Sequence, residues 1–316
     1  MKVTIGVDIG GTNTAIGIVN ESGECIRKNA VPSNTQPDAE RYGEELSQAI
    51  KNLLSQEKDV ELVGVGIGAP NGNYHRGTIE HAPNLKFDGI VPLVDIMRNF
   101  FEVPIFLTND ANAAAMGEKV YGGAKEMDDF IMITLGTGVG SGIFVNGQML
   151  YGHDGFAGEL GHVTAVPGGR QCNCGKKGCL ETYCSANGLR RTAFEMLASN
   201  NAESTLRDFT FNELTSKKIS EEAMAGDKIA RKAFAYTGKI LGKQLADFVA
   251  FSSPEAIFLF GGLVNAGDIL LEPVKNHFHD SLMTIYKGKV RILESEIKEG
   301  DAAIIGASAL VWNELK

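Results

Sequence analysis

The feature that most constrains this chain is the stretch from Gly158 to Glu181, which carries one His and three Cys. Its candidate metal ligands are His162, Cys172, Cys174 and Cys179. Three thiolates and one imidazole are a usual ligand set of a closed, tetrahedral structural Zn²⁺ site. The alternative is a disulfide with a spare thiol, but Cys172 and Cys174 are too close for an easy bridge, and nothing else indicates an oxidising compartment. We therefore predict structural zinc.

Two glutamates flank these candidate ligands. Glu159 lies three residues before His162, and Glu181 lies two residues after Cys179. Exposed glutamates are common in any protein, so the pair alone indicates little. Beside a rigid metal site, however, the two carboxylates could act as fixed acceptors for hydroxyl groups of a ligand.

Composition limits the class of protein and its partners. The length of 316 residues favours about two domains, and the net charge of −9 argues against nucleic acid or an anionic membrane as a partner. No apolar run reaches the roughly 18 residues of a membrane span. An acid at Asp8 argues against a secretory signal. Four of the five Cys lie between 172 and 184, which suits a metal site in a reducing cytoplasm.

A strand–turn–strand pattern occurs twice in the chain. Two β-branched runs, 3–7 and 14–19, flank a Gly-rich turn at Asp8–Asn13. The same pattern returns at 130–147, and the two windows align without gaps and with a few identities. We interpret this as a duplication, which predicts two similar α/β lobes facing one another across a cleft.

Apolar runs and helical periodicity predict the remaining elements. Further strands are expected at 25–31, 60–70, 103–110, 256–263 and 290–295. Helices are expected at 37–56, 92–101, 111–121, 185–200, 212–224, 227–251, 266–280 and 301–315, the last with one apolar face. This alternation is typical of an α/β protein with a mixed or parallel sheet.

The turns Asp8–Asn13 and Gly136–Gly142 are candidate phosphate sites, because closely spaced Gly residues let an anion approach successive N–H groups. The side chains of Thr12, Asn13 and Thr137 add donors. No P-loop motif occurs, and turns that lie between strands disfavour a Rossmann dinucleotide site. A lone Gly-rich hairpin is usually only a tight turn. Two matching turns, with a further pair at Gly261-Gly262, favour nucleotide binding.

Asp110 follows Asn109 where a predicted strand ends and a predicted helix begins. One interpretation is a helix N-cap, for which Asp is a preferred residue. The other is functional, because α/β sheets place ligands at the carboxyl ends of their strands. A carboxylate there, near a phosphate chain, could accept the proton of an attacking hydroxyl, as a general base does in phosphoryl transfer.

Together these motifs resemble the ROK family (repressors, open reading frames, sugar kinases). The resemblance runs from residue 3 to about 310. It rests on the turns at 8–13 and 135–142, the strand–helix junction at 108–115, the GELGH motif at 158–162, the Cys-rich motif at 172–181 and FGGL at 260–263. The zinc stretch is specific to the family, whereas the turns are shared across the actin/hexokinase-like superfamily. Within the family the chain is most similar to bacterial glucokinases. Repressor members carry an added N-terminal helix-turn-helix, for which a first turn at residue 8 leaves no room.

The resemblance implies a two-lobed, duplicated actin/hexokinase-like (ribonuclease H-like) α/β fold whose central cleft closes over ATP–Mg²⁺ and a sugar. One lobe would comprise residues 1–120, joined by the C-terminal helix 300–316. The other would comprise residues 121–299, with a zinc-binding insertion at 159–181. Family members are commonly homodimers, so a homodimer is also expected.

The same resemblance implies roles for individual residues. Asp110 would be the base that activates the sugar 6-hydroxyl, and the other hydroxyls would be held by Asn84, Asn109, Glu159, His162 and Glu181. The phosphates and Mg²⁺ would lie among Asp8, Gly10, Gly11, Thr12, Asn13, Gly136, Thr137, Gly138, Gly261 and Gly262. Zinc would be held by His162, Cys172, Cys174 and Cys179.

A link from zinc to the sugar is also expected through His162, because one imidazole nitrogen can bind metal while the other faces a second partner. On this hypothesis Cys174→Ser raises the sugar KM and leaves the KM for ATP within a few-fold.

The expected function is ATP-dependent phosphorylation of a hexose at the 6-hydroxyl, with glucose as the first candidate. Where many glucokinases have a Pro/Gly-Trp element after the equivalent of Asn84-Leu85, this chain has 86–89 (KFDG), which leaves the sugar open. Fructose, mannose, allose, N-acetylglucosamine and N-acetylmannosamine are alternatives. A non-catalytic sugar sensor would have no use for Asp110, and a zinc-stabilised interaction module would leave the matched turns unexplained.

Overall fold

The computed structural model describes residues 1–82, 85–87, 89–199, 201–297 and 300–315. The chain divides into two compact units. Unit 1 contains residues 1–128, 142–158 and 295–316, and unit 2 contains residues 129–141 and 159–294. The sequence-based division assigned residues 121–299 to one lobe, whereas contacts group 142–158 with unit 1. The reason is visible around residue 73: Asn73 Nδ2 donates to the Asp154 carbonyl at 2.7 Å, and Tyr74 stacks on Tyr151 at 4.1 Å.

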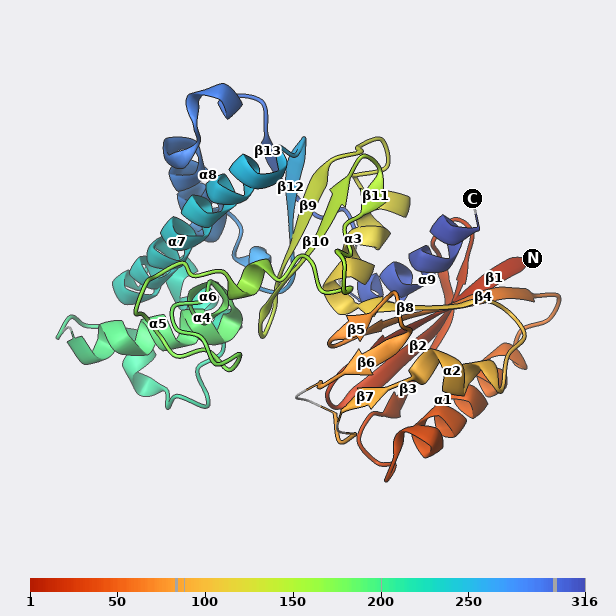
Figure 1. The fold of residues 1–316 in the computed structure, drawn as a ribbon. Helices are drawn as coiled ribbons and strands as arrows, with labels where there is room; N and C mark the ends of the chain where they lie inside the picture. The colour runs from red at the N-terminus through yellow and green to blue at the C-terminus, as the bar shows by residue number, and fades with distance from the viewer. Residues whose placement is uncertain (83–84, 88, 200, 298–299, 316) are drawn as a thin grey trace. The chain divides into compact units, whose positions relative to one another are not determined.

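The sheet of unit 1 has the strand order β3-β2-β1-β4-β8 (Figure 1). Its strands are β1 (Lys2–Ile9), β2 (Asn13–Asn20), β3 (Cys25–Pro32), β4 (Glu61–Ala69) and β8 (Ile105–Asn109). The β1–β2 and β2–β3 pairs are antiparallel, whereas β1–β4 and β4–β8 are parallel. The expected strands of this part of the chain are therefore confirmed. The parallel strands β1, β4 and β8 end at the same edge of the sheet, because Asp8 pairs with Gly68 and Gly68 pairs with Thr108.

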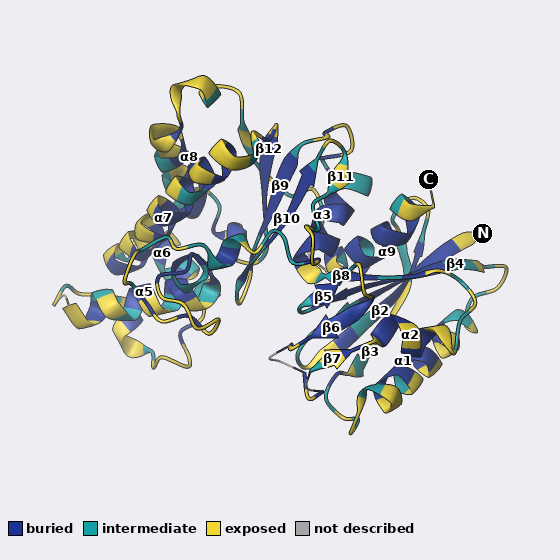
Figure 2. Ribbon diagram, in the orientation of Figure 1, coloured by how far each residue is buried: buried dark blue, intermediate teal, exposed yellow. Residues whose placement is uncertain are grey.

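Side-chain alternation assigns the two faces of this sheet. Val3, Ile5 and Val7 belong to a buried cluster with α1 (Ala39–Leu54) and α2 (Leu93–Arg98). On the other face lie α3 (Asp110–Val120) and α9 (Ala302–Glu314) (Figure 2). There Gly6 is required, because a Cβ at that position would lie 2.0 Å from the Ile304 carbonyl oxygen.

The expected single apolar face of the last helix is wrong. Helix α9 is buried almost all round, from Ala302 to Trp312, because it contacts both the sheet and α3. Its backbone lies against the strands, since a Cβ at Gly66 would lie 1.9 Å from the Ala307 carbonyl oxygen.

The second sheet repeats the topology of the first, with the order β11-β10-β9-β12-β13. Its strands are β9 (Phe130–Leu135), β10 (Val139–Val145), β11 (Gln148–Met149), β12 (Ala256–Phe260) and β13 (Arg291–Glu294). Here too a hairpin leads to a third antiparallel strand on one side and two parallel strands on the other. The α/β class and the duplicated actin/hexokinase-like architecture are therefore confirmed.

Helices make up most of the rest of unit 2: α4 (Glu181–Cys184), α5 (Ala186–Ser199), α6 (Ser216–Met224), α7 (Lys228–Ser252) and α8 (Asp268–Ser281). Helices α7 and α8 pack closely, and a Cβ at Gly242 would lie 2.4 Å from the Val274 carbonyl oxygen. A small sheet in unit 1, β5 (Gly72–Asn73), β6 (Thr78–Glu80) and β7 (Ile90–Val91), was not expected. Among the described residues, no helix is long and apolar enough to cross a membrane.

Candidate active site and metal cluster

The first Gly-rich turn joins β1 to β2 in unit 1. Gly10 N donates to the Asn13 carbonyl at 3.1 Å, which closes the turn, and Ser33 N donates to the Thr12 carbonyl at 3.0 Å. The side chain of Asn34 donates to the Gly11 carbonyl. These contacts hold the turn from its backbone and leave the side chains of Thr12 and Asn13 exposed.

Asp110 is the first residue of α3, directly after β8. The N-cap is Asn109, whose Oδ1 accepts from Ala111 N at 2.8 Å, so the interpretation of Asp110 as the cap is wrong. Asp110 Oδ1 also accepts from Ala111 N at 2.8 Å, and the residue keeps solvent access. Asn and Asp are both preferred N-cap residues. Asn109 is the cap here because its backbone is extended, as at an N-cap, whereas Asp110 is already helical.

Two carboxyl groups of unit 1 have raised pKa values. Loss of hydration by surrounding protein raises the pKa of Asp110, against the opposing effect of its backbone hydrogen bonds. Desolvation, followed by the nearby charge of Asp110, raises the pKa of Asp8 to about 6. Asp8 lies in β1 beside the first turn and Asp110 directly follows β8, so both acids stand at the carboxyl-end edge of the parallel strands, with β4 between them.

The second Gly-rich turn joins β9 to β10 and belongs mainly to unit 2. Gly136 N donates to the Gly138 carbonyl at 3.1 Å, and Gly140 N donates to Thr134 Oγ1 at 3.2 Å. Thr137 is exposed at the tip. The pair Gly261-Gly262 lies beside it, because Leu263 N donates to the Leu135 carbonyl at 3.2 Å.

The four predicted zinc ligands lie together. One ligand atom from each of His162, Cys172, Cys174 and Cys179 falls within 4.8 Å of the others. The Sγ atoms of Cys174 and Cys179 are 3.6 Å apart. A tetrahedral ion with Zn–S bonds of about 2.3 Å requires sulfurs about 3.8 Å apart, so these residues fit structural zinc. The loop needs Gly178, whose φ is +80° and whose added Cβ would lie 1.8 Å from the Val166 carbonyl oxygen.

The two nitrogens of His162 face different partners. Nδ1 lies 3.6 Å from Cys172 Sγ, inside the cluster. Nε2 lies 3.9 Å from Glu159 Oε2, outside it, and Glu159 is exposed. Nδ1 is therefore the nitrogen placed to ligate a metal, while Nε2 is directed toward the exposed carboxylate.

A small polar pocket borders this cluster within unit 2. Its volume is about 200 Å³, and its lining includes Thr137, Cys172, Glu181, Ser185, Asn187 and Arg191. The tip of the second turn and the metal cluster therefore share one hollow, with Glu181 between them.

Comparison with known proteins identifies the family, because the sequence model of the ROK family matches residues 4–314. The chain belongs to the ROK family. A glucokinase of Halalkalibacterium halodurans is 37% identical over 279 residues, which cover 87% of this chain and 84% of that protein. A crystal structure of a ROK family glucokinase from Streptomyces griseus, in complex with glucose and AMPPNP, has a TM-score of 0.81 and 34% identity, covering 98% of this chain and 99% of that one. A xylose repressor of Caldicellulosiruptor bescii is 28% identical and matches 98% of this chain and 78% of its own length.

The candidate residues of this ROK protein fall into two groups. Unit 1 brings together Asn109, Asp110, Asp8 and the first turn. Unit 2 brings together Glu159, His162, Glu181, the predicted zinc ligands and the second turn with Gly261-Gly262. Asn84 lies outside the described residues.

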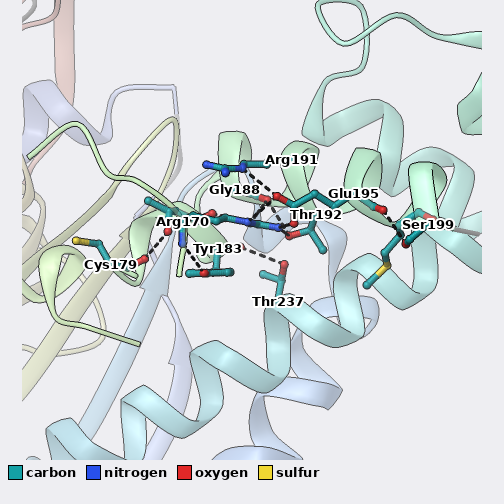
Figure 3. Close-up of polar contacts among 11 residues, drawn as sticks. Arg170, Cys179, Tyr183, Gly188, Arg191, Thr192, Glu195, Ser199 and Thr237 are labelled. Atoms are coloured by element: carbon teal, nitrogen blue, oxygen red, sulfur yellow. Dashed lines mark hydrogen bonds and ion pairs between the residues drawn. The ribbon is translucent and has the colours of Figure 1, made fainter. Parts of the chain in front are cut away.

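Arg170 was missed by sequence reasoning and is central to the segment 158–181 that carries the predicted zinc ligands, which we call the metal loop (Figure 3). It is 7% exposed, its guanidinium lies 4.5 Å from the Tyr183 ring centre, and its ion pair with Glu195 measures 2.5 Å. It also donates to three groups that flank this ion pair, namely the carbonyls of Thr182 and Gly188 and Thr192 Oγ1. Lying two residues before Cys172, it fastens the metal loop to α5. An arginine in a loop normally indicates an exposed residue, so no sequence signal pointed to this role.

Arg170→Met should lower the free energy of unfolding by about 2–4 kcal/mol, because buried carbonyl groups lose their donors. Urea denaturation measures the effect. Arg191→Met is the matched control, since its pair with Glu195 is largely exposed and should change stability by no more than about 1 kcal/mol. Equal effects of the two variants would contradict the anchoring role of Arg170.

Proposed function

We propose that this ROK protein is an ATP-dependent sugar kinase that phosphorylates the 6-hydroxyl of a hexose, with glucose as the first substrate to test. The observation that carries the proposal is Asp110, an exposed residue directly after β8 whose carboxyl lies near Asp8 and the first Gly-rich turn. The glucokinase relatives support the same class of reaction.

In this proposal Asp110 accepts the proton of the sugar hydroxyl as that oxygen attacks the γ-phosphorus of ATP, and ADP leaves. Magnesium, when bound with ATP, neutralises charge on the phosphates. The turns at 8–13 and 136–142 offer backbone N–H groups to those phosphates. Asn109, Glu159, His162, Glu181 and Asn84 are proposed to hold the remaining hydroxyls, and zinc is proposed to be structural.

A second candidate is a sugar sensor without kinase activity, which the similarity to a xylose repressor over 98% of this chain favours. An ADP-release assay over glucose, fructose, mannose, allose and the N-acetylhexosamines separates the two. Sugar-dependent ADP release supports a kinase and names its sugar. Sugar binding by calorimetry without ADP release supports the sensor. A homodimer is proposed separately, and light scattering tests it.

The pH dependence of kcat/KM for the sugar tests Asp110 as the base. The base works in its ionised form, and the raised pKa keeps it protonated to a higher pH than an ordinary Asp, whose pKa is about 4. We therefore expect kcat/KM for the sugar to fall, as pH is lowered, through a midpoint above that ordinary value. The profile should be measured at sugar concentrations well below KM, with folding monitored by circular dichroism. An acid limb at the ordinary pKa would contradict the assignment.

A further inference from the structure

The segment with the predicted zinc ligands also holds the backbone of the second Gly-rich turn. Before the cluster, Leu160 N donates to Ser141 Oγ at 3.2 Å. Next to it, Gly161 is so close that an added Cβ would lie 2.0 Å from the Val139 carbonyl oxygen. The strand that follows the turn is thus packed directly on the residues that lead to His162.

The residues after the cluster hold the other side of the same turn. Ala186 N donates to the Gly136 carbonyl at 2.8 Å, and Asn187 Nδ2 donates to the Thr137 carbonyl at 3.1 Å. Gly-rich backbone has many accessible conformations, so a turn with Gly136, Gly138 and Gly140 needs such contacts to keep one shape.

Glu181 makes the contact that joins the turn to the metal cluster. Its Oε2 accepts from Val139 N at 3.0 Å, and an added Cβ at Gly138 would lie only 2.5 Å from that oxygen. Its Oε1 lies 3.9 Å from Cys172 Sγ. A carboxylate repels phosphate, so Glu181 beside the second Gly-rich turn, the candidate phosphate turn, is not explained by contact with the phosphates. Its charge-assisted hydrogen bond from Val139 N explains it instead, because that bond fixes the backbone of the turn.

We propose that Glu181 is a positioning residue that transmits the order of the metal cluster to the phosphate turn. A metal held by Cys172 and Cys179 fixes the loop on which Glu181 stands, and the carboxylate then fixes Val139 and Gly138. This inference rests on the proposed function for the nature of the ligand at the turn. It also revises one expectation: loss of zinc should weaken nucleotide binding as well as sugar binding.

The test measures Mg·ADP binding by calorimetry without sugar, so that hydroxyl contacts of Glu181 cannot contribute. Glu181→Ala should raise the nucleotide Kd by about 10- to 100-fold, the usual worth of a hydrogen bond to a charged group. Glu181→Gln, which keeps an acceptor oxygen, should recover part of the loss. Thr164→Ala, an exposed position between Gly158 and Glu181 that is not among the residues lining the pocket beside the second turn, should leave the Kd unchanged. Zinc content, measured by mass spectrometry, should stay at the wild-type value in all three.

A second readout does not depend on nucleotide. Amide hydrogen exchange at 136–141 should accelerate in Glu181→Ala and in chelator-treated wild type, and adding zinc should reverse the latter. Chelation should cause little further acceleration in Glu181→Ala. Unchanged exchange in Glu181→Ala, or equal acceleration by chelation in wild type and variant, would overturn the proposal. Wild type that binds no nucleotide yet shows the expected exchange pattern would instead overturn only the proposed function.

Discussion

Asp110→Asn is expected to lower kcat by about 10²- to 10⁴-fold, the range of general-base catalysis, while the sugar Kd changes little. The amide keeps the shape of the side chain and can still accept from Ala111 N, but it cannot take a proton. Steady-state kinetics and calorimetry with the preferred sugar measure the two quantities. A variant that retains more than a few per cent of the wild-type rate would remove Asp110 from the catalytic role.

Stability provides the control for this variant. Because desolvation raises the pKa of Asp110, its charged form is disfavoured in the folded state, and the neutral Asn should unfold at an equal or higher temperature. Asp95→Asn, on an exposed part of α2 beside Arg98, is the matched change and should leave kcat unaltered. A loss of activity without a fall in melting temperature would therefore reflect the missing base and not unfolding.

Cys174→Ser is expected to lower zinc from one ion per chain to a small fraction and to lower Tm by on the order of 10 °C. Cys174 is exposed, so the replacement disturbs packing little and tests the metal itself. The sugar KM should rise, because His162 and Glu159 lose the ion that orders their loop. Metal analysis, calorimetry and kinetics give the three readouts.

Cys25→Ser is the matched control, since this thiol lies in unit 1 outside the cluster and should leave zinc content intact. If a stably folded, zinc-free Cys174→Ser protein bound sugar normally, the link from metal to sugar would be wrong, and His162 would act only as a ligand.

The fold was predictable from the sequence wherever a hydrophobic pattern repeated over several residues. The hairpins around both Gly-rich turns were predictable, because β-branched runs flank a short Gly-rich segment in each case. The small sheet β5–β7 was not, since strands of two or three residues show no periodicity. The all-round burial of α9 also escaped prediction, because it depends on glycines in strands far away in sequence, such as Gly6 and Gly66.

The site was predictable where chemistry lies in residue type and spacing. Four residues of metal-ligating types in one short stretch predicted that they lie together. In the structure, one possible ligand atom from each of them lies within 4.8 Å of the others. The hydrogen bond from Val139 N to Glu181 could not be read from spacing, because it depends on how the metal loop folds back on the turn. Arg170 gave no signal, since its partners lie 12 to 25 residues away in sequence.

The packing of α9 on β1 and β4 has a consequence for synthesis of the protein on the ribosome. The strands of unit 1 are made first, yet the backbone of Ile304 and Ala307 covers their glycines. At about 5–20 residues per second, the ribosome needs on the order of 10–35 s to pass from Asp128 to Ala302. During that interval only α3 lies on that face of the N-terminal sheet, and the glycines of β1 and β4 lack their cover, while residues 129–141 and 159–294 of unit 2 emerge and can already pack. Nascent chains of this protein should therefore depend on chaperones early, and stop codons that remove α9 should be as harmful as lesions in β1.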